Sequence, residues 1–277
     1  MDPHRYCRAK VAASGSSFLP AFRLLEPARR RALTAFYAFC REVDDIVDEC
    51  REPVVARAKL AWWRAEVERL YAGAPQHPVA RALGEYVERY AIAREQLMEI
   101  MDGVEMDLEQ SRYADFRALR LYCHRVAGVV GEVSAQIFGY SERGTLKYAA
   151  LLGLALQLTN IIRDVGEDAR RGRIYLPLDE LAAHGVEEAD ILAGRSTPAF
   201  ARLMEFQYQR AEAAFDEALA RLPRADRRRQ RPGLAMAAIY RTLLREIRRD
   251  GFRVLEHRVL LPPARKLLIA WRAWLAA

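Results

Sequence analysis

The sequence predicts an all-α fold, a helical bundle built around a single core. Twelve prolines divide the chain into segments of helical length, and none falls between Pro78 and Pro177. Within these segments apolar residues recur at helical spacing. No stretch shows the sustained alternation of apolar and polar residues that a strand would require. Short connections between long amphipathic helices indicate a bundle, so we expect one domain over residues 1–277.

The predicted helices follow the prolines along the chain. Proline is accepted in the first turn of a helix and breaks a helix interior. The first three and the last three segments therefore start or end beside prolines, and the middle three fill the proline-free stretch. The predicted helices span residues 28–50, 54–72, 78–91, 94–110, 115–139, 142–168, 197–221, 232–257 and 262–275.

The composition excludes a disordered chain and favours an anionic partner. Of 277 residues, 52% are hydrophobic, which is enough apolar surface to build a core. The 44 Lys and Arg exceed the 37 Asp and Glu by seven, and only four of the basic residues are lysines. Arginine binds phosphate through a bidentate fork. The charge therefore suits a phosphate-bearing ligand without identifying it.

The sequence gives weaker evidence about the cellular location of the protein and about membrane or nucleic-acid partners. The four cysteines show no C-x-x-C pairing and follow no secretory signal, so a reducing cytoplasm is the predicted location. The uncharged stretch Tyr148–Ile162 is too short for a membrane span, although the apolar segment Leu267–Leu275 is compatible with peripheral membrane contact. The arginine run Arg224–Arg231 has no interleaved aromatic residues. It is interpreted as a solvated turn, and no nucleic-acid partner is expected.

The first candidate site is an acidic helical segment. Tyr37, Arg41, Asp44 and Asp48 fall within an arc of about 60° on a helix that advances about 100° per residue. The segment is otherwise apolar, which predicts partial burial, and a buried carboxylate needs a cation. Taken alone, the segment favours a solvated acidic face balanced by Arg41 and Arg51.

A second acidic stripe lies on a strongly apolar helix. Gln157, Asn160, Asp164 and Asp168 fall within an arc of about 80°. Polar residues on a core helix need partners. A structural hydrogen-bond network is one interpretation, but the duplicated stripe favours a site.

The two stripes together predict a magnesium-dependent diphosphate site. Facing carboxylates supply the oxygen ligands that hard divalent cations prefer, and Mg²⁺ commonly binds through a few carboxylates plus substrate phosphates. Arg41 and Arg163 would donate bidentate hydrogen bonds to the same phosphates.

Four segments, in chain order, resemble the landmark motifs of the squalene/phytoene synthase family. They are Ser14–Phe18, Tyr37–Asp48, Tyr122–Gly131 and Gln157–Pro177. The second acidic stripe followed by Arg-Ile-Tyr-Leu-Pro is the most specific of the four. The resemblance covers nearly the whole chain. It implies a helical bundle of the isoprenoid synthase type with a central active-site cavity.

The resemblance also implies residue roles in a head-to-head prenyltransferase. Two or three Mg²⁺ ions would be held by Asp44, Asp48, Asn160, Asp164 and Asp168, and the four aspartates together with Tyr122 are the implied catalytic residues. The implied substrate-binding residues are Ser14, Gly15, Ser16, Ser17, Tyr37, Arg41, Gln157, Arg163 and Tyr240. Asp107 matches a further acidic position of the family, although a solvated helix face explains it nearly as well.

The chemistry implied for such an enzyme begins with the loss of diphosphate from an allylic carbon. The cation is captured by the 2,3-double bond of the second substrate, and loss of a proton closes a cyclopropane. Magnesium and arginine neutralise the leaving group, and apolar walls exclude water from the cation. The segment Gly166–Pro177 is interpreted as a flexible flap over the diphosphates.

Within the family, the segments Ser14–Phe18, Met101–Asp107 and Leu121–Ala127 look most like those of bacterial presqualene diphosphate synthases of hopanoid biosynthesis. Farnesyl diphosphate is then the expected substrate, and NADPH is not expected. Contact with downstream pathway enzymes is compatible with this assignment. The alternatives within the family are an NADPH-dependent squalene synthase and a phytoene or dehydrosqualene synthase. Outside it, a terpene cyclase, a head-to-tail elongase and a non-enzymatic helical interaction protein are the rival interpretations.

Overall fold

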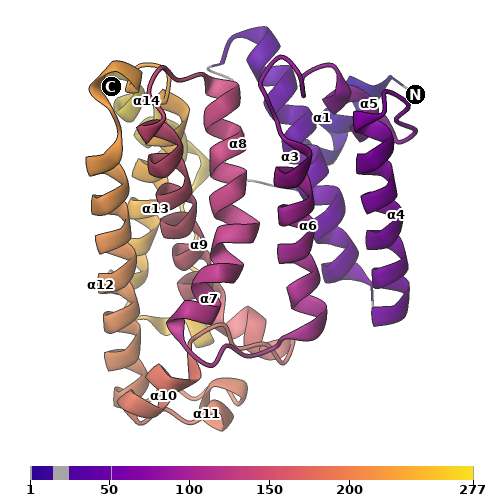
Figure 1. Ribbon diagram of the computed structural model, residues 1–277. Helices are drawn as coiled ribbons and strands as arrows, with labels where there is room; N and C mark the ends of the chain where they lie inside the picture. Colours follow the sequence, from indigo (N-terminus) through magenta and orange to yellow (C-terminus); the bar gives the residue numbers. More distant parts are fainter. Residues whose placement is uncertain (1, 15–24, 51, 277) are drawn as a thin grey trace.

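The computed structural model describes residues 2–14, 25–50 and 52–276, and this part of the chain is a bundle of helices (Figure 1). It contains no strand, and one isolated parallel bridge joins Arg112 to Ile174. The prediction of an all-α fold is confirmed. In chain order the helices are α1 (Pro3–Ala13), α3 (Pro27–Glu49), α4 (Pro53–Tyr71), α5 (Pro78–Gly84), α6 (Arg94–Glu109), α7 (Phe116–Cys123), α8 (Val129–Phe138), α9 (Gly144–Arg170), α10 (Leu178–His184), α11 (Glu188–Leu192), α12 (Pro198–Arg221), α13 (Arg231–Arg249) and α14 (Pro263–Ala276).

Proline fixes the start of many of these helices. The helices α3, α4, α5, α12 and α14 each begin at a proline, where the missing N–H has no intrahelical partner to lose. In α12 the Thr197 hydroxyl also accepts a hydrogen bond from the Phe200 N–H at 3.1 Å. The predicted starts of these helices therefore agree with the structure within one residue.

Three helices were not predicted. In α1, Asp2 accepts hydrogen bonds from the His4 and Arg5 N–H groups, and Pro3 is the first helical residue. This Asp-Pro start was a readable signal. In contrast, α10 and α11 have 7 and 5 residues, too few to show a helical period.

Three predicted helices differ from the structure, because two end earlier than predicted and one is interrupted. The helix predicted over 78–91 ends at Gly84, and the following turns close at Ala91 with φ of 50°. The helix predicted over 232–257 ends at Arg249, because Gly251 and Phe252 adopt the left-handed conformation that stops a helix. The helix predicted over 115–139 is divided into α7 and α8 by a π-helical turn, His124–Gly128.

A buried acid fixes the start of α9. Asp226 accepts hydrogen bonds from the Ser141 N–H and hydroxyl, the Glu142 N–H and the Thr145 hydroxyl. Burial raises the pKa of Asp226, but these donors outweigh burial and hold the pKa well below its ordinary range. The arginine run around Asp226 includes exposed side chains such as Arg228, as the solvated-turn interpretation requires, but it contains this buried anchor.

The buried apolar residues form two clusters with a seam between them, so the prediction of a single core is wrong. One contains residues of α1, α3, α4, α5 and α6, and the other contains residues of α9, α12 and α13. Helix α8 contributes to both, because Val133 belongs to the first cluster and Ala135 to the second. Helices α3 and α9 therefore face the region between two packed halves, where the site lies.

Two glycines let α9 cross its neighbours closely. A Cβ atom at Gly153 would lie 2.2 Å from the Ala127 carbonyl oxygen, and one at Gly131 would lie 2.3 Å from the Ala149 carbonyl oxygen. Both neighbours are backbone atoms, which cannot rotate away as a side chain would. Glycine is therefore required by packing at both positions.

A Gly153→Ala substitution should destabilise the protein by about 2 kcal/mol, because the added methyl group forces the π-helical turn away from α9. The measurement is the free energy of unfolding by urea. Gly144→Ala, at the start of the same helix, is the matched control, because its Cβ would lie 3.4 Å from Pro223. Equal stability of the two variants would contradict this account of the crossing.

Helix α9 is the one helix in the described residues that is long and apolar enough to cross a membrane by length and composition. Its most apolar window has a mean hydropathy of 1.3, and 61% of that window is buried inside the protein. This is the pattern of a core helix.

Candidate active site

A cavity of about 420 Å³ lies between the two apolar clusters. Its walls come mainly from α3, α6, α8, α9 and α13, together with the π-helical turn. Along both α3 and α9 the lining residues change from apolar near the helix start to acidic near the helix end. The apolar lining includes Leu33, Phe36, Val104, Phe138, Leu152, Leu156 and Met236. The cavity therefore has an apolar part and a strongly polar part.

The polar part carries both predicted acidic stripes. Asp44 and Asp48 of α3, and Asp164 and Asp168 of α9, all line this one cavity. They lie toward the C-terminal ends of their helices, where the helix dipole disfavours negative charge. Asp48 and Asp168 lie in the last turn of their helices, where this unfavourable effect is largest, so their placement favours a role in binding cations.

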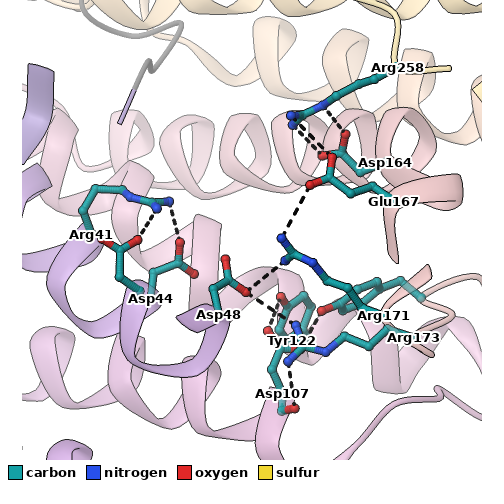
Figure 2. A network of polar contacts seen from close by, with 12 residues as sticks. Arg41, Asp44, Asp48, Asp107, Tyr122, Asp164, Glu167, Arg171, Arg173 and Arg258 are labelled. Carbon is teal, nitrogen blue, oxygen red and sulfur yellow. Dashed lines mark hydrogen bonds and ion pairs between the residues drawn. The ribbon is translucent and has the colours of Figure 1, made fainter. Parts of the chain in front are cut away.

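Arginine side chains contact three of these four carboxylates (Figure 2). Arg41 donates to Asp44 at 2.6 Å. Asp164 accepts from Arg163 at 2.8 Å and pairs with Arg258, also at 2.8 Å. These cations hold the carboxylates in place and are themselves within the cavity lining.

Two further arginines connect the stripes. Arg171 lies between Asp48 of α3, at 3.4 Å, and Glu167 of α9, at 3.6 Å (Figure 2). Arg173 approaches Asp48 at 3.6 Å. The polar part thus contains an alternation of acidic and basic groups that spans from α3 to the end of α9.

The electrostatic balance still leaves excess negative charge. Desolvation, together with neighbouring carboxylates, raises the pKa of Asp44 to about 7, although Arg41 opposes the shift. Burial, followed by repulsion from Asp164 and Glu167, raises the pKa of Asp168 to about 7. Within the described residues the Asp168 carboxylate forms no hydrogen bond or ion pair. A cation entering this part of the cavity would relieve both costs.

The donor set fits magnesium that is shared with a ligand. Asn160 donates to Gln157 at 3.2 Å, but its buried side-chain oxygen has no hydrogen-bond partner. That oxygen and the carboxylates are the hard ligands that Mg²⁺ prefers. In the described part of the chain, no three His, Cys, Asp or Glu side chains converge on one point. Ions would therefore need oxygens from a ligand or from water to complete their coordination.

A half-buried carboxylate links two tyrosines beside the acidic stripes. Asp107 of α6 accepts hydrogen bonds from the Tyr122 hydroxyl at 3.0 Å and the Tyr175 hydroxyl at 2.7 Å. Burial raises the pKa of Asp107, whereas these two donors and Arg173 lower it. The interpretation of Asp107 as part of a solvated helix face is therefore wrong. Its carboxylate fixes the position of the Tyr122 hydroxyl in the cavity wall.

The structure brings most of the predicted substrate-binding residues together. Tyr37, Arg41, Gln157 and Arg163 line the cavity. Tyr240 is buried beside the Arg163 guanidinium, which opposes the rise in the Tyr240 pKa that burial causes. Tyr240 therefore contacts Arg163, which lines the cavity, and is not itself a lining residue.

The N-terminal serine segment is only partly described. The Ser14 hydroxyl donates to the Val11 carbonyl at 2.7 Å at the end of α1. Gly15, Ser16 and Ser17 lie outside the described residues. The substrate-binding role of this segment stays a prediction.

The segment predicted to be a flexible flap is packed. Gly166 belongs to α9, where a Cβ would lie 2.4 Å from the Val254 carbonyl oxygen. Beyond the helix, the Ile174 N–H donates to the Ser111 carbonyl at 3.0 Å, and Ile174, Tyr175 and Leu176 are buried. Three consecutive buried residues anchor the second half of the segment and hold Tyr175 against Asp107, so the interpretation of the whole segment as a flexible flap is wrong.

Several lining residues were not singled out from the sequence. Arg171 and Arg173 lie inside the Gln157–Pro177 segment, so their motif was identified but their contacts to Asp48 were not. Arg258 had no local signal, because it lies 94 residues from Asp164 along the chain and no spacing connects them.

Known proteins resemble this chain in sequence and in fold. A model of the squalene/phytoene synthase family matches residues 11–265. Phytoene synthase 2 from the chloroplast of Zea mays is 37% identical over 273 residues, which cover 96% of this chain and 68% of the maize protein.

Two solved structures share the fold over most of both chains. A dehydrosqualene synthase in complex with a ligand superposes with a TM-score of 0.88 at 25% identity, covering 98% of this chain and 95% of that one. The squalene synthase HpnC from Alicyclobacillus acidocaldarius superposes with a TM-score of 0.82 at 28% identity, covering 90% and 94% respectively.

Proposed function

Because the chain belongs to the squalene/phytoene synthase family, we propose that it joins two prenyl diphosphates head to head and releases diphosphate. The proposed substrate is farnesyl diphosphate, and the proposed product is presqualene diphosphate. One observation carries the proposal. Two acidic stripes and five arginines line the polar part of a single cavity whose other walls are apolar.

The residues that would hold magnesium are Asp44, Asp48, Asn160, Asp164 and Asp168. When bound with the substrate, Mg²⁺ would neutralise the negative charge that develops on the departing diphosphate. The excess negative charge at Asp168 and the unpartnered oxygen of Asn160 support this assignment.

The arginines would bind the diphosphate oxygens. Arg41, Arg163 and Arg258 contact aspartates that are also proposed metal ligands. A diphosphate with its metal ions offers new anionic partners to the same guanidinium groups, and bidentate hydrogen bonds to phosphate oxygens orient the leaving group. The network therefore keeps cations and carboxylates positioned before the substrate arrives.

The apolar walls would hold the prenyl chains and exclude water. In the proposed reaction the allylic C1–O bond breaks, and its electron pair leaves with the diphosphate. The 2,3-double bond of the second substrate captures the C1 cation, and loss of a proton closes the cyclopropane. Water would quench such a cation, so side chains such as Phe36 and Leu152 at the cavity wall serve the chemistry as well as packing.

A phytoene synthase is the second candidate. The curated maize relative is named a phytoene synthase, and it aligns with 96% of this chain. That reaction would use the same carboxylates and arginines with a longer prenyl chain. The two candidates therefore differ in the length of prenyl chain that the apolar part of the cavity must hold.

The proposed function is tested by identifying products. The pure protein is incubated with Mg²⁺ and either farnesyl or geranylgeranyl diphosphate, with and without NADPH, and the products are analysed by mass spectrometry. We expect presqualene diphosphate from farnesyl diphosphate regardless of NADPH. Squalene formed only with NADPH would assign a squalene synthase, and phytoene from the longer substrate would assign the second candidate. No product from either substrate would favour the non-enzymatic interaction protein.

A Tyr122→Phe variant should form product about tenfold more slowly or divert it to another product, because the hydroxyl fixed by Asp107 lies in the cavity wall. Tyr175→Phe should have a smaller effect in the same direction, since it removes one of the two donors that position Asp107. The measurement is turnover together with the product distribution.

Tyr113→Phe is the matched control for both variants. Tyr113 belongs to the same aromatic cluster, with its ring centroid 5.5 Å from that of Tyr122, but its buried hydroxyl has no hydrogen-bond partner. Its loss should therefore leave turnover unchanged. An unchanged rate and product for Tyr122→Phe would reduce Tyr122 to a packing residue.

A further inference from the structure

We propose that the outer face of helix α14 docks the protein on an anionic lipid bilayer. Four large apolar side chains of this helix are open to solvent, with exposed fractions of 49% at Leu267, 44% at Leu268, 56% at Trp271 and 63% at Leu275. Leu260, in the segment before the helix, is 62% exposed. No other helix in the described residues carries four exposed large hydrophobic residues.

These side chains form one continuous face. On a helix that advances about 100° per residue, Leu267, Trp271, Leu275 and Leu268 fall within an arc of about 100°. The opposite face holds the helix to the protein, because Ala270 is buried and Ile269 packs against the apolar cluster that includes α9 and α13. The exposed face is therefore additional to the packing that the fold requires.

The charge around this face suits an anionic surface. From Leu260 to Ala276 the chain contains three Arg and Lys residues, Arg265, Lys266 and Arg272, and no Asp or Glu. Arg265 pairs with Glu246 at 2.7 Å, whereas Arg272, beside the apolar arc, is exposed and forms no ion pair within the described residues. An apolar helix face bordered by arginine is the pattern of a helix that lies in the headgroup region of a membrane.

A second copy of the chain fits this face less well. Two copies paired through a twofold axis would bring the same patch against itself. Arg272 of one copy would then approach a patch of the other that is bordered by the same arginine, and α14 contains no acidic residue to neutralise it. An anionic bilayer supplies both an apolar layer and negative charge, so it matches the face in both respects.

The position of α14 relates this face to the cavity. Helix α14 packs on α13 (Figure 1). Helix α13 supplies Gly233 and Met236 to the cavity wall. At the far end of α14, the Trp274 ring centroid lies 5.7 Å from the Arg231 guanidinium. Arg231 directly follows Gln230, which lines the cavity. Docking through α14 would therefore place one wall of the apolar cavity close to the bilayer, where prenyl lipids dissolve.

The inference is tested with the full chain by co-sedimentation with vesicles. The probes are phosphatidylcholine vesicles with and without phosphatidylglycerol, at low and high salt and without prenyl substrate. The wild-type protein should sediment with the anionic vesicles, and high salt should weaken its binding. Trp271→Ser combined with Leu275→Ser should weaken the partition coefficient about tenfold. Arg272→Glu should weaken binding to the anionic vesicles about tenfold and leave zwitterionic vesicles unaffected.

The control replaces exposed apolar residues elsewhere. Val54→Ser with Val55→Ser, at the start of α4, should bind vesicles as the wild type does, since these residues are exposed but lie on another helix. Circular dichroism checks that each variant is folded. The proposal is overturned if the wild type fails to bind anionic vesicles, if the α14 double variant binds undiminished, or if that variant instead converts a dimer to a monomer while vesicle binding persists. Because no substrate is present, each of these results leaves the proposed condensation unaffected.

Discussion

An Asp164→Asn variant is expected to lose about 10²–10³-fold in turnover while keeping its helical content. Asp164 is a proposed magnesium ligand, and its carboxylate also contacts both Arg163 and Arg258. The amide keeps the size of the side chain but carries no charge, so it weakens cation binding and also weakens the contacts that hold Arg163 and Arg258. The measurement is diphosphate release at saturating substrate across a series of Mg²⁺ concentrations.

Asp216→Asn is the matched control for this prediction. Asp216 on α12 is 66% exposed, pairs with Arg241 at 2.7 Å and does not line the cavity. It should retain the wild-type rate. If Asp164→Asn retained near-wild-type turnover at every Mg²⁺ concentration, the metal assignment at this position would be wrong.

An Asp168→Asn variant is expected to lose activity and to gain stability. Asp168 is a proposed magnesium ligand, so turnover should fall by a factor similar to that for Asp164→Asn. Without metal, however, burial and the neighbouring carboxylates raise its pKa from an ordinary value of 3.8 to about 7. Each pKa unit corresponds to about 1.4 kcal/mol. Removing this charge should stabilise the metal-free protein by about 2 kcal/mol at pH 8, after allowance for relaxation of Arg171 and Arg173.

The pH dependence of that gain follows from the sign of the shift. The pKa of Asp168 is higher in the folded than in the unfolded state, so ionisation costs more in the folded protein. The wild type therefore loses stability as the pH rises from about 4 through about 7, whereas asparagine does not titrate. The gain should be absent near pH 4, grow up to pH 7 and stay constant above it. Thermal unfolding in EDTA measures it, and a destabilised Asp168→Asn at pH 8 would show that the carboxylate has a structural role.

Much of the fold was predictable because it depends on local signals. Prolines at the starts of α3, α4, α12 and α14 fix helix boundaries through the missing N–H, and the proline-free stretch contains the long core helix α9. The errors have local causes too. The π-helical turn at His124–Gly128 depends on how closely α9 approaches, and a helical period does not reveal it.

The acidic stripes were predictable for the same reason, whereas their partners were not. Asp44 and Asp48 share a helix face by spacing, as do Asp164 and Asp168, so one sequence segment reveals each pair. The contacts of Arg258 with Asp164 and of Asp107 with Tyr175 join distant segments, and only the packed bundle brings them together. The apolar cavity wall could not be predicted, because its residues have the same apolar pattern in the sequence as other core residues. Only the packing of the two clusters shows which of them line the cavity.

The most direct test is whether magnesium and a prenyl diphosphate bind only together. The probe is farnesyl thiodiphosphate, in which sulfur replaces the oxygen between C1 and the first phosphorus and so slows ionisation. Thermal unfolding is measured with this probe, with and without Mg²⁺. The two added together should raise the melting temperature by about 5 °C or more, while each alone raises it by less than about 1 °C. Asp164→Asn should abolish the joint effect. An equal rise in EDTA, or a full joint effect in Asp164→Asn, would contradict a cavity in which the acidic stripes hold the diphosphate through magnesium.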